Sequence, residues 1–265
     1  MDKFFDTTLD FVTVKKGKGQ KALALTEDQK AMQWKRVDSR RVAYWGLLQK
    51  KFEPLYKQMG EAVAEAYPND IDKAIGKQIP SWQKMLAAAS MTVIEDFGND
   101  VAEQFKTIKP SEVKFDPFTA AIRKWAAKHA AESVKTILDT QKEAMHNLIA
   151  KGVEDNLGNS EIAKSIRVFY TDNAHYLAMR IARTETSTAA GYGQHEAAKQ
   201  SGVNRKLWIS SRDDRVRDSH QDMDGETAAL DEPYSNGMMQ VGDPSGGPGE
   251  IINCRCAEQF FMERG

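Results

Sequence analysis

The chain has 265 residues, of which 41% are hydrophobic and 28% are charged, and its formal net charge is −1. This composition is ordinary for a globular protein, and no run approaches the ~18 consecutive apolar residues that a membrane span needs. The first residues contain acids and no apolar core, which does not fit a signal peptide. We therefore expect no membrane partner and a protein that stays in the cytoplasm where it is made, or enters an assembly there.

The charges are unevenly distributed along the chain. Residues 15–57 contain twelve lysines and arginines against four acids, so the remainder carries a net negative charge. A basic segment of this kind indicates contact with nucleic acid or an acidic protein surface, or else a solvated helix face. The candidate contact residues are Lys15, Lys16, Lys18, Arg36, Arg40, Arg41, Lys50 and Lys51.

The N-terminal half begins without periodicity and then becomes helical. Residues 1–25 include a stretch rich in lysine and glycine and indicate a flexible arm. Thr26, followed by two acids, is typical of a helix N-cap. Pro54 is expected to kink or break the helix that follows. Apolar residues at steps of three or four define one face of that helix: Val42, Trp45, Leu48, Phe52, Leu55, Met59 and Val63.

Two more helices are predicted in the middle of the chain. One is capped by Ser81 and runs to about Phe105. Residues 107–117 contain two prolines, which indicates a linker or boundary. The next helix, over about 118–152, keeps a long apolar stripe that includes His129. Because no ligand-spaced partner accompanies His129, we interpret it as a packed core histidine.

The pattern changes in the last third of the chain. We predict a short helix over 161–170 and a separate long helix over 173–200, ended by a glycine cap at Gly202. Short strands follow at 207–209 and 256–262, with many glycines and prolines between them. The predicted fold class is therefore mainly α, with long helices in the body and a small α+β C-terminal tip of short strands and Gly/Pro-rich loops after residue 203.

These patterns also predict the domain organisation. The predicted parts are a flexible arm at 1–25, a helical N-terminal domain at 26–110, a long-helix region at 111–202 and the small tip at 203–265.

Both cysteines lie in the tip, at Cys254 and Cys256. A disulfide between them would be strained, and the expected compartment is reducing. On a strand, residues two apart point to the same side, so both sulfurs could hold one zinc ion. His220 would supply a third ligand and Asp224 or Asp222 a fourth. The alternative is that the thiols are small buried groups that fill a tight tip.

A catalytic constellation is hard to find. His220 could act as a base oriented by Asp214 or Asp224, but no serine or cysteine lies in a nucleophile elbow. His195 could approach only through tertiary folding. We therefore predict a protein that is not an enzyme and needs no cofactor, zinc excepted. The alternative is a metal-dependent nuclease or hydrolase centred on His220, Asp224, Cys254 and Cys256.

Arginines and hydroxyls gather on the long helix over 173–200. Arg180, Arg183 and Thr184 share one helical face, whereas Glu185 points away from it. We interpret this face as structural, with Arg183 anchoring the charged loop at 212–217 through arginine–carboxylate pairs.

The order of motifs over about 158–265 is specific. The motifs are Ile181-Ala-Arg-Thr-Glu-Thr186, Lys206-Leu-Trp208, Asp214-Arg-Val-Arg217, His220, Asp224-Gly225 and Asn253-Cys-Arg-Cys256. Together they resemble the Mu protein F-like family, the head-morphogenesis or minor capsid proteins of tailed bacteriophages. The resemblance implies that Arg183, Glu185, Trp208, Asp214, Arg217 and Gly225 are structural motif residues of the tip.

The resemblance also implies a location and partners. It implies a structural minor head protein inside the virion at the portal vertex, present in the host cytoplasm during assembly. The implied partners are the portal protein, the major capsid or scaffolding protein and the packaged DNA. The implied roles are procapsid assembly and DNA packaging or ejection, and no catalytic residue comes with them.

Overall fold

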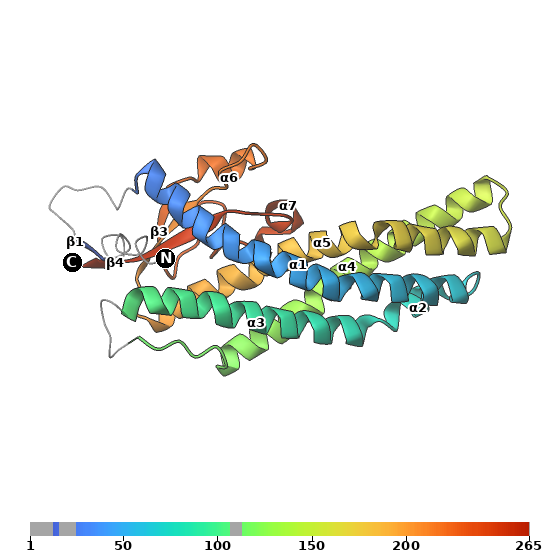
Figure 1. The fold of residues 1–265 in the computed structure, drawn as a ribbon, viewed down its shortest axis with the longest axis horizontal. Coiled ribbons are helices and arrows are strands. Elements are labelled where there is room, and N and C mark those ends of the chain that lie inside the picture. The colour runs from blue at the N-terminus through green and yellow to red at the C-terminus, as the bar shows by residue number, and fades with distance from the viewer. Residues whose placement is uncertain (1–12, 16–24, 107–112, 265) are drawn as a thin grey trace. The chain divides into compact units, whose positions relative to one another are not determined.

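The computed structural model describes residues 13–15, 25–106 and 113–264, and most of them are helical (Figure 1). The long first part holds α1 Glu27–Ala66, α2 Ile71–Gly76, α3 Ile79–Lys106, α4 Ala120–Glu154 and α5 Asn159–Gln200. Shorter elements follow, namely β2 Arg205–Ile209, α6 Asp218–Asp222, β3 Thr227–Ala229, the 3-10 turn η2 Pro244–Gly246, α7 Pro248–Ile251 and β4 Ala257–Arg264, while β1 Thr13–Lys15 precedes α1. The predicted fold class is confirmed. Among the described helices, none is both long and apolar enough to cross a bilayer.

The chain forms two compact units whose segments alternate along the sequence. Unit 1 combines Met1–Tyr44, Thr92–Phe118 and Arg183–Gly265, and unit 2 combines Trp45–Met91 and Thr119–Ala182. Because α1, α3 and α5 each contribute to both units, the division differs from the consecutive domains 26–110, 111–202 and 203–265 that the sequence suggests. The predicted arm lies outside the described residues, apart from residues 13–15 and Leu25.

Helix α1 begins as predicted and continues past its proline. The Thr26 hydroxyl accepts a hydrogen bond from the Gln29 amide at 3.3 Å, and the Gln29 side chain accepts one from the Thr26 amide at 2.8 Å, which is a capping box. Pro54 lies inside the helix, so the prediction of a break is wrong. Pro54 and Lys50 are both exposed, so water can reach the Lys50 carbonyl that loses its helical partner.

The middle helices follow the prediction with shifted starts. Helix α3 begins at Ile79, so Ser81 lies within its first turn and is not the cap. The Ser81 hydroxyl donates instead to the Gln78 carbonyl at 2.8 Å. Helix α4 is capped by Thr119, whose hydroxyl accepts from the Ile122 amide. His129 is buried on α4 and stacks on Trp125 with 4.8 Å between ring centroids, as expected for a core histidine.

Helix α5 is one continuous helix, whereas the sequence suggested two. The proposed break near residues 171–172 is absent because buried residues continue at helical spacing through it. These residues are Ile162, Ile166, Tyr170, Ala174, Leu177, Ala178 and Ile181. The predicted end at Gly202 is confirmed. Gly202 has φ +70°, its amide donates to the Lys199 carbonyl, and the Val203 amide donates to the Ala198 carbonyl, which is a Schellman motif.

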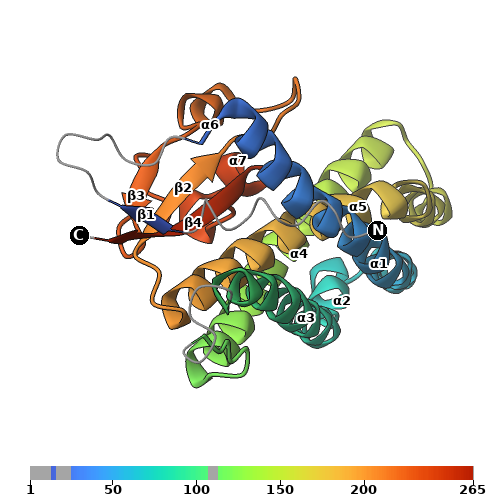
Figure 2. The ribbon, with the colours of Figure 1, turned by 60° about the vertical axis from the view of Figure 1, so that its left-hand side comes forward.

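A four-stranded sheet in the order β1-β4-β2-β3 lies in unit 1 (Figure 2). Strand β2 pairs antiparallel with β4 from Arg205↔Phe261 to Ile209↔Ala257, and β1 pairs parallel with β4. The two predicted strands are present, while β3 was missed because only three residues form it. On α5, a Cβ at Gly191 would lie 1.9 Å from the Val241 carbonyl oxygen, so only glycine lets the 240–243 loop approach this helix.

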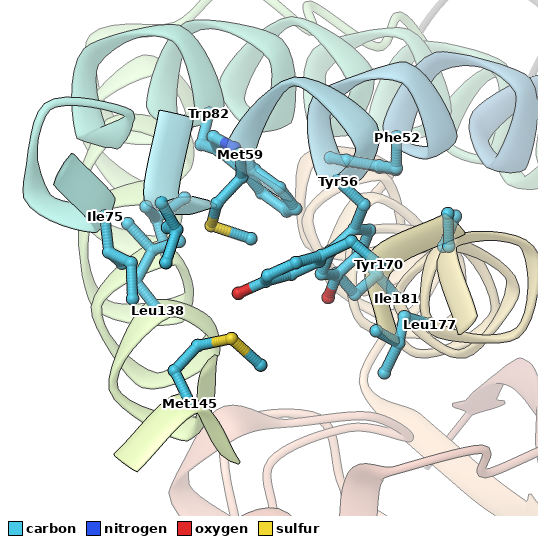
Figure 3. Packing of buried hydrophobic residues seen from close by; sticks show 14 of the residues in the cluster. Phe52, Tyr56, Met59, Ile75, Trp82, Leu138, Met145, Tyr170, Leu177 and Ile181 are labelled. Atoms are coloured by element: carbon cyan, nitrogen blue, oxygen red, sulfur yellow. The ribbon is translucent and has the colours of Figure 1, made fainter. Parts of the chain in front are cut away.

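The core of unit 2 is built from the interior faces of its helices (Figure 3). Tyr56 meets Trp82 edge to face with 4.9 Å between centroids and stacks on Tyr170 at 6.4 Å. Helices α1 and α5 approach each other closely at Gly60. A Cβ added at this glycine would lie only 2.6 Å from the Cβ of Tyr170. Val42, which the sequence placed on the buried face of α1, belongs to unit 1 and is largely exposed.

The close approach at Gly60 predicts opposite effects of two substitutions in α1. Gly60→Ala should destabilise the protein by about 1–2 kcal/mol, since overpacking costs ~1–3 kcal/mol and outweighs the gain in helix propensity. Gly46→Ala, at a site with nothing within 4 Å of the new methyl, should stabilise it by about 0.5–1 kcal/mol. Urea unfolding followed by the helical circular dichroism signal measures both, and equal effects would contradict the packing at Gly60.

Candidate metal centre

One histidine and both cysteines meet inside unit 1. His220 comes from α6, whereas Cys254 and Cys256 lie between α7 and β4. The ligand atoms of the three side chains all lie within 4.8 Å of one another, and all three residues are buried. The His220 Nδ1 atom is 3.7 Å from the Cys254 sulfur and 3.4 Å from the Cys256 sulfur. Three of the four residues predicted as metal ligands are therefore brought together.

The backbone around the cysteines is shaped by a turn at the end of α7. Asn253 has φ 56°, in the left-handed region that asparagine tolerates better than most residues. The Cys254 amide donates to the Ile251 carbonyl at 3.1 Å. This turn directs the chain from α7 into β4 and places both cysteines on the side of His220.

The far side of the His220 ring is held by an acid that the sequence reading missed. The Nε2 atom lies 2.6 Å from the Glu250 carboxylate. The ring also packs edge to face on Trp208, with 5.2 Å between centroids. Since Glu250 binds Nε2, the Nδ1 atom is left facing the sulfurs. Glu250 lies thirty residues from His220 in the sequence, so residue spacing did not identify it.

Electrostatics couple the three groups. Burial works against the charged imidazole, but hydrogen bonds and charges at Cys254 and Glu250 raise the pKa of His220 overall. Hydrogen bonding from Cys256 and the nearby His220 hold the pKa of the Cys254 thiol well below its usual value despite burial. The same hydrogen bond to Cys254, together with burial, raises the pKa of Cys256.

Asp224 does not join this cluster, contrary to the prediction. Its carboxylate accepts a hydrogen bond from the Ser210 amide at 2.9 Å and pairs with Lys30 and with Arg212, the latter at 3.2 Å. These contacts lower the pKa of Asp224 against the opposing effect of burial. Asp222, the other proposed ligand, is exposed. Asp224 therefore links the first turns of α1, through Lys30, to the loop after β2, through Ser210 and Arg212.

Three side chains of α1 bind the backbone that carries the cysteines. The Gln33 amide donates to the Glu258 carbonyl at 2.7 Å, the Trp34 indole to the Arg255 carbonyl at 2.8 Å, and the Arg41 guanidinium to the Cys256 carbonyl at 2.5 Å. We call Gln33, Trp34 and Arg41 the α1 donors. They occupy one helical face and fix the start of β4 on α1.

Helix α5 holds the same segment through hydroxyl groups. The Thr184 hydroxyl accepts from the Asn253 amide at 3.2 Å, and the Ser187 hydroxyl donates to the Cys254 carbonyl at 2.8 Å. Nearby on α5, Glu185 is buried and Arg183 is half-buried. The anchoring of the charged loop by Arg183 stays a prediction.

Arg255, which lies between the two cysteines in the sequence, holds the charged loop at 212–217. Its guanidinium binds both Asp38 carboxylate oxygens at 3.1 and 2.7 Å, pairs with Asp213 and lies 5.2 Å from the centre of the Trp34 ring. The hydrogen bonds that Arg255 donates to Asp38 outweigh burial and raise the pKa of Arg255. The motif acid Asp214 is exposed, so Asp213 is the acid that anchors this loop.

The remaining motif residues have structural contacts. Arg217 donates to the Ile252 carbonyl at 2.6 Å. Gly225 has φ +86°, and its amide donates to the Trp208 carbonyl. Trp208 is fully buried and packs edge to face on Tyr234 at 5.2 Å as well as on His220. These positions agree with a structural role for the motif.

Arg41 does not belong to an exposed contact surface, although it is part of the predicted basic set. Its side chain is fully buried. Arg36 pairs with Asp100 of α3, and Arg40 pairs with Asp100 at 3.0 Å and with Asp96 at 2.7 Å. All three arginines therefore form hydrogen bonds or ion pairs with groups of unit 1.

The other members of the basic set differ in what the structure describes. Lys50 and Lys51 are exposed on the part of α1 that belongs to unit 2. For Lys15 only the backbone is described, and Lys16 and Lys18 lie outside the described residues. Lys50 and Lys51 therefore remain as available candidates for a partner contact.

A second buried polar cluster lies next to the sheet and was not predicted. Lys206 is fully buried and donates to the Leu230 and Met239 carbonyls, with its ammonium 4.8 Å from the centre of the Tyr234 ring. Tyr234 donates to one Glu258 carboxylate oxygen at 3.0 Å, and the Val241 amide donates to the other at 3.1 Å. Burial raises the pKa of Glu258 to about 7.

His195 lies in the same unit but outside the cysteine cluster. It is buried on α5, and burial together with the charge of Lys206 lowers its pKa to about 4. His195 therefore does not join the cluster of His220, Cys254 and Cys256.

The Glu258 carboxyl predicts a pH dependence of stability. Its pKa is about 7 in the folded chain and about 4.5 when unperturbed, so the folded state holds a proton that the unfolded state releases. The free energy of unfolding should therefore fall as pH rises from about 4.5 to 7, by at most ~1.4 kcal/mol per pH unit. Glu258→Gln should remove this slope, while Glu232→Gln, at an exposed site, should keep it. An unchanged slope in Glu258→Gln, measured by urea unfolding, would contradict the assignment.

Comparison with known proteins identifies part of the chain. The sequence model of the family described as Phage Mu protein F like protein matches residues 143–259. NAD(+)–arginine ADP-ribosyltransferase EFV of Enterococcus faecalis is 30% identical over 137 residues, which is 49% of this chain and 28% of that protein. The chain thus covers well under two thirds of that relative. No solved structure gives a significant match.

The matched segment contains His220, Cys254 and the whole of α5, and it ends within β4. This confirms the resemblance drawn from the ordered motifs. Residues 143–259 of this chain are thus similar to the Phage Mu protein F like family, which suggests a phage head morphogenesis protein.

Proposed function

We propose that the chain is a structural minor head protein of a tailed bacteriophage that binds the portal protein inside the head during procapsid assembly. The family match over residues 143–259 carries this proposal. Further proposed partners are the major capsid or scaffolding protein and the packaged DNA. The proposed location is the portal vertex of the virion, reached from the host cytoplasm.

The contacts of the motif residues support a structural role. Arg255 is held between Asp38 and Asp213, and Asp224 is paired with Lys30 and Arg212. Arginines and acids that are paired with each other stabilise loops of irregular backbone. They are not available to bind or activate a substrate without breaking these pairs.

The metal-dependent nuclease or hydrolase has less support. In that reading Asp224 would act beside His220, Cys254 and Cys256. Its carboxylate is instead engaged by a backbone amide and two cations. Glu250, the acid that does contact the cluster, binds the imidazole Nε2 atom. An orienting acid of this type is common behind metal-bound histidines, so it does not by itself indicate a general base.

The ADP-ribosyltransferase name of the relative also does not carry over to this chain. The shared segment covers 28% of that protein. The 137 shared residues are close in number to those of the family match over residues 143–259. We propose that the two proteins share the Mu protein F-like segment and differ in the activity of the remainder.

The exposed lysines suggest where a partner binds. Lys50 and Lys51 lie side by side in sequence on α1 of unit 2, and neither makes an ion pair among the described residues. Exposed charges raise association rates and give specificity for surfaces of opposite charge. We propose that an acidic surface of the portal protein contacts these lysines, with DNA as the alternative ligand.

Affinity purification of the full chain co-expressed with the portal protein of the same phage tests this proposal. Portal protein should co-purify, and Lys50→Glu with Lys51→Glu should weaken binding at least tenfold, about 1.4 kcal/mol. The control Lys124→Glu with Lys135→Glu makes the same charge change at exposed sites on α4 of the same unit.

Four outcomes would count against the proposal. Equal binding by both double variants would exclude the lysine contact, and absence of portal protein would contradict the partner. DNA binding that falls steeply with salt, with no portal binding, would favour nucleic acid as the ligand. Zinc-dependent cleavage of DNA would favour the nuclease.

A further inference from the structure

We propose that His220, Cys254 and Cys256 bind one zinc ion, which ties α6 to the start of β4. The inference is independent of the proposed partner. It rests on the donor set, the distances, the side chain behind the histidine and a buried cation beside the cysteines.

The distances match those that zinc requires. Zinc binds cysteine sulfur at about 2.3 Å and histidine nitrogen at about 2.0–2.1 Å in tetrahedral geometry, which separates nitrogen from sulfur by about 3.5 Å. The His220 Nδ1 atom lies 3.4 Å from one sulfur and 3.7 Å from the other. The three donors therefore surround a point that a zinc ion could occupy without a change of fold.

The donors are also soft and oriented. Two sulfurs and one imidazole nitrogen favour zinc over hard cations such as magnesium or calcium. Glu250 holds the opposite nitrogen of His220 at 2.6 Å, which is the acid–histidine–metal arrangement seen behind many metal-bound histidines. The Ser187 and Arg41 side chains fix the carbonyls of Cys254 and Cys256, so both sulfurs are positioned before an ion arrives.

Arg41 provides a second observation that points to negative charge at this place. It is fully buried, and its Nε and Nη2 atoms have no hydrogen-bond partner among the described residues. A buried guanidinium is costly without an anion nearby. Zinc would keep both thiols deprotonated, and Cys254 and Cys256 are among the groups whose negative charge acts on the Arg41 guanidinium, together with Asp38 and Glu258.

The site is closed, which indicates a structural ion. His220, Cys254 and Cys256 are 1%, 3% and 1% exposed, so a substrate has no access to the donors. The ion would link α6, the turn after α7 and the start of β4.

Metal analysis of the full chain tests the inference. The protein purified without chelators should contain about one zinc per chain by mass spectrometry, and cobalt substitution should give the sulfur-to-cobalt charge-transfer bands of a tetrahedral site with two thiolates. Cys254→Ser should lose the zinc and the bands. Glu250→Gln should keep the bands but weaken zinc affinity by about 10–100-fold.

Asp224→Asn is the matched control, because Asp224 lies on the same segment but outside the cluster, and it should retain one zinc. Circular dichroism identifies which variants are folded. Folded parent protein without zinc and without cobalt bands would overturn the inference, as would a Cys254–Cys256 disulfide in protein prepared under reducing conditions. Zinc retained at full affinity by folded Cys254→Ser would also overturn it. None of these results would affect portal binding, so the two proposals can fail separately.

Discussion

The organisation of unit 1 depends on how the segment from Asn253 to Glu258 is held. This segment lacks regular structure until β4 begins, so the polar groups of its backbone need partners from elsewhere. The α1 donors bind three of its carbonyls, and Thr184 and Ser187 of α5 bind an amide and another carbonyl. With the segment fixed, both cysteines face His220, Arg255 reaches Asp38 and Asp213, and Glu258 enters the core.

This arrangement connects parts of the chain that are far apart in sequence. The family match covers residues 143–259, yet the α1 donors, Asp38 and Lys30 lie outside it. In this protein the Mu protein F-like segment is completed by α1. The basic N-terminal part, which suggested a surface for an acidic partner, therefore supplies internal contacts through Arg36, Arg40 and Arg41.

Most of the long helices and part of the candidate metal site could be predicted from the sequence. Periodicity identified α1, α3 and α4, and the Cys254-x-Cys256 spacing suggested a zinc site in which His220 would be a third ligand, with buried thiols that only fill the tip as the alternative. Arg41 was missed because its charge counted toward a basic segment, although it lies at helical spacing between the buried Val37 and Trp45. Its carbonyl partner is 215 residues away, and no local pattern shows such a partner.

Two other errors have local causes. Polar residues after Tyr170 resembled a helix end, but burial of Tyr170 and Ala174 on the same face keeps α5 continuous. Asp224 was chosen as a ligand because it is near His220 in sequence, whereas Glu250 reaches the ring through the fold. Acids are frequent in this region, and spacing alone does not distinguish the one that faces the histidine.

The most direct test of this account is hydrogen–deuterium exchange of peptides covering residues 253–262 in Arg41→Met. Loss of the guanidinium leaves the Cys256 carbonyl buried without its donor, which costs about 1–3 kcal/mol. Exchange in this segment should therefore accelerate by about tenfold or more relative to the parent, while the exposed control Lys35→Met should show no change. Unchanged protection of residues 253–262 in a folded Arg41→Met variant would contradict the central role of the α1 donors.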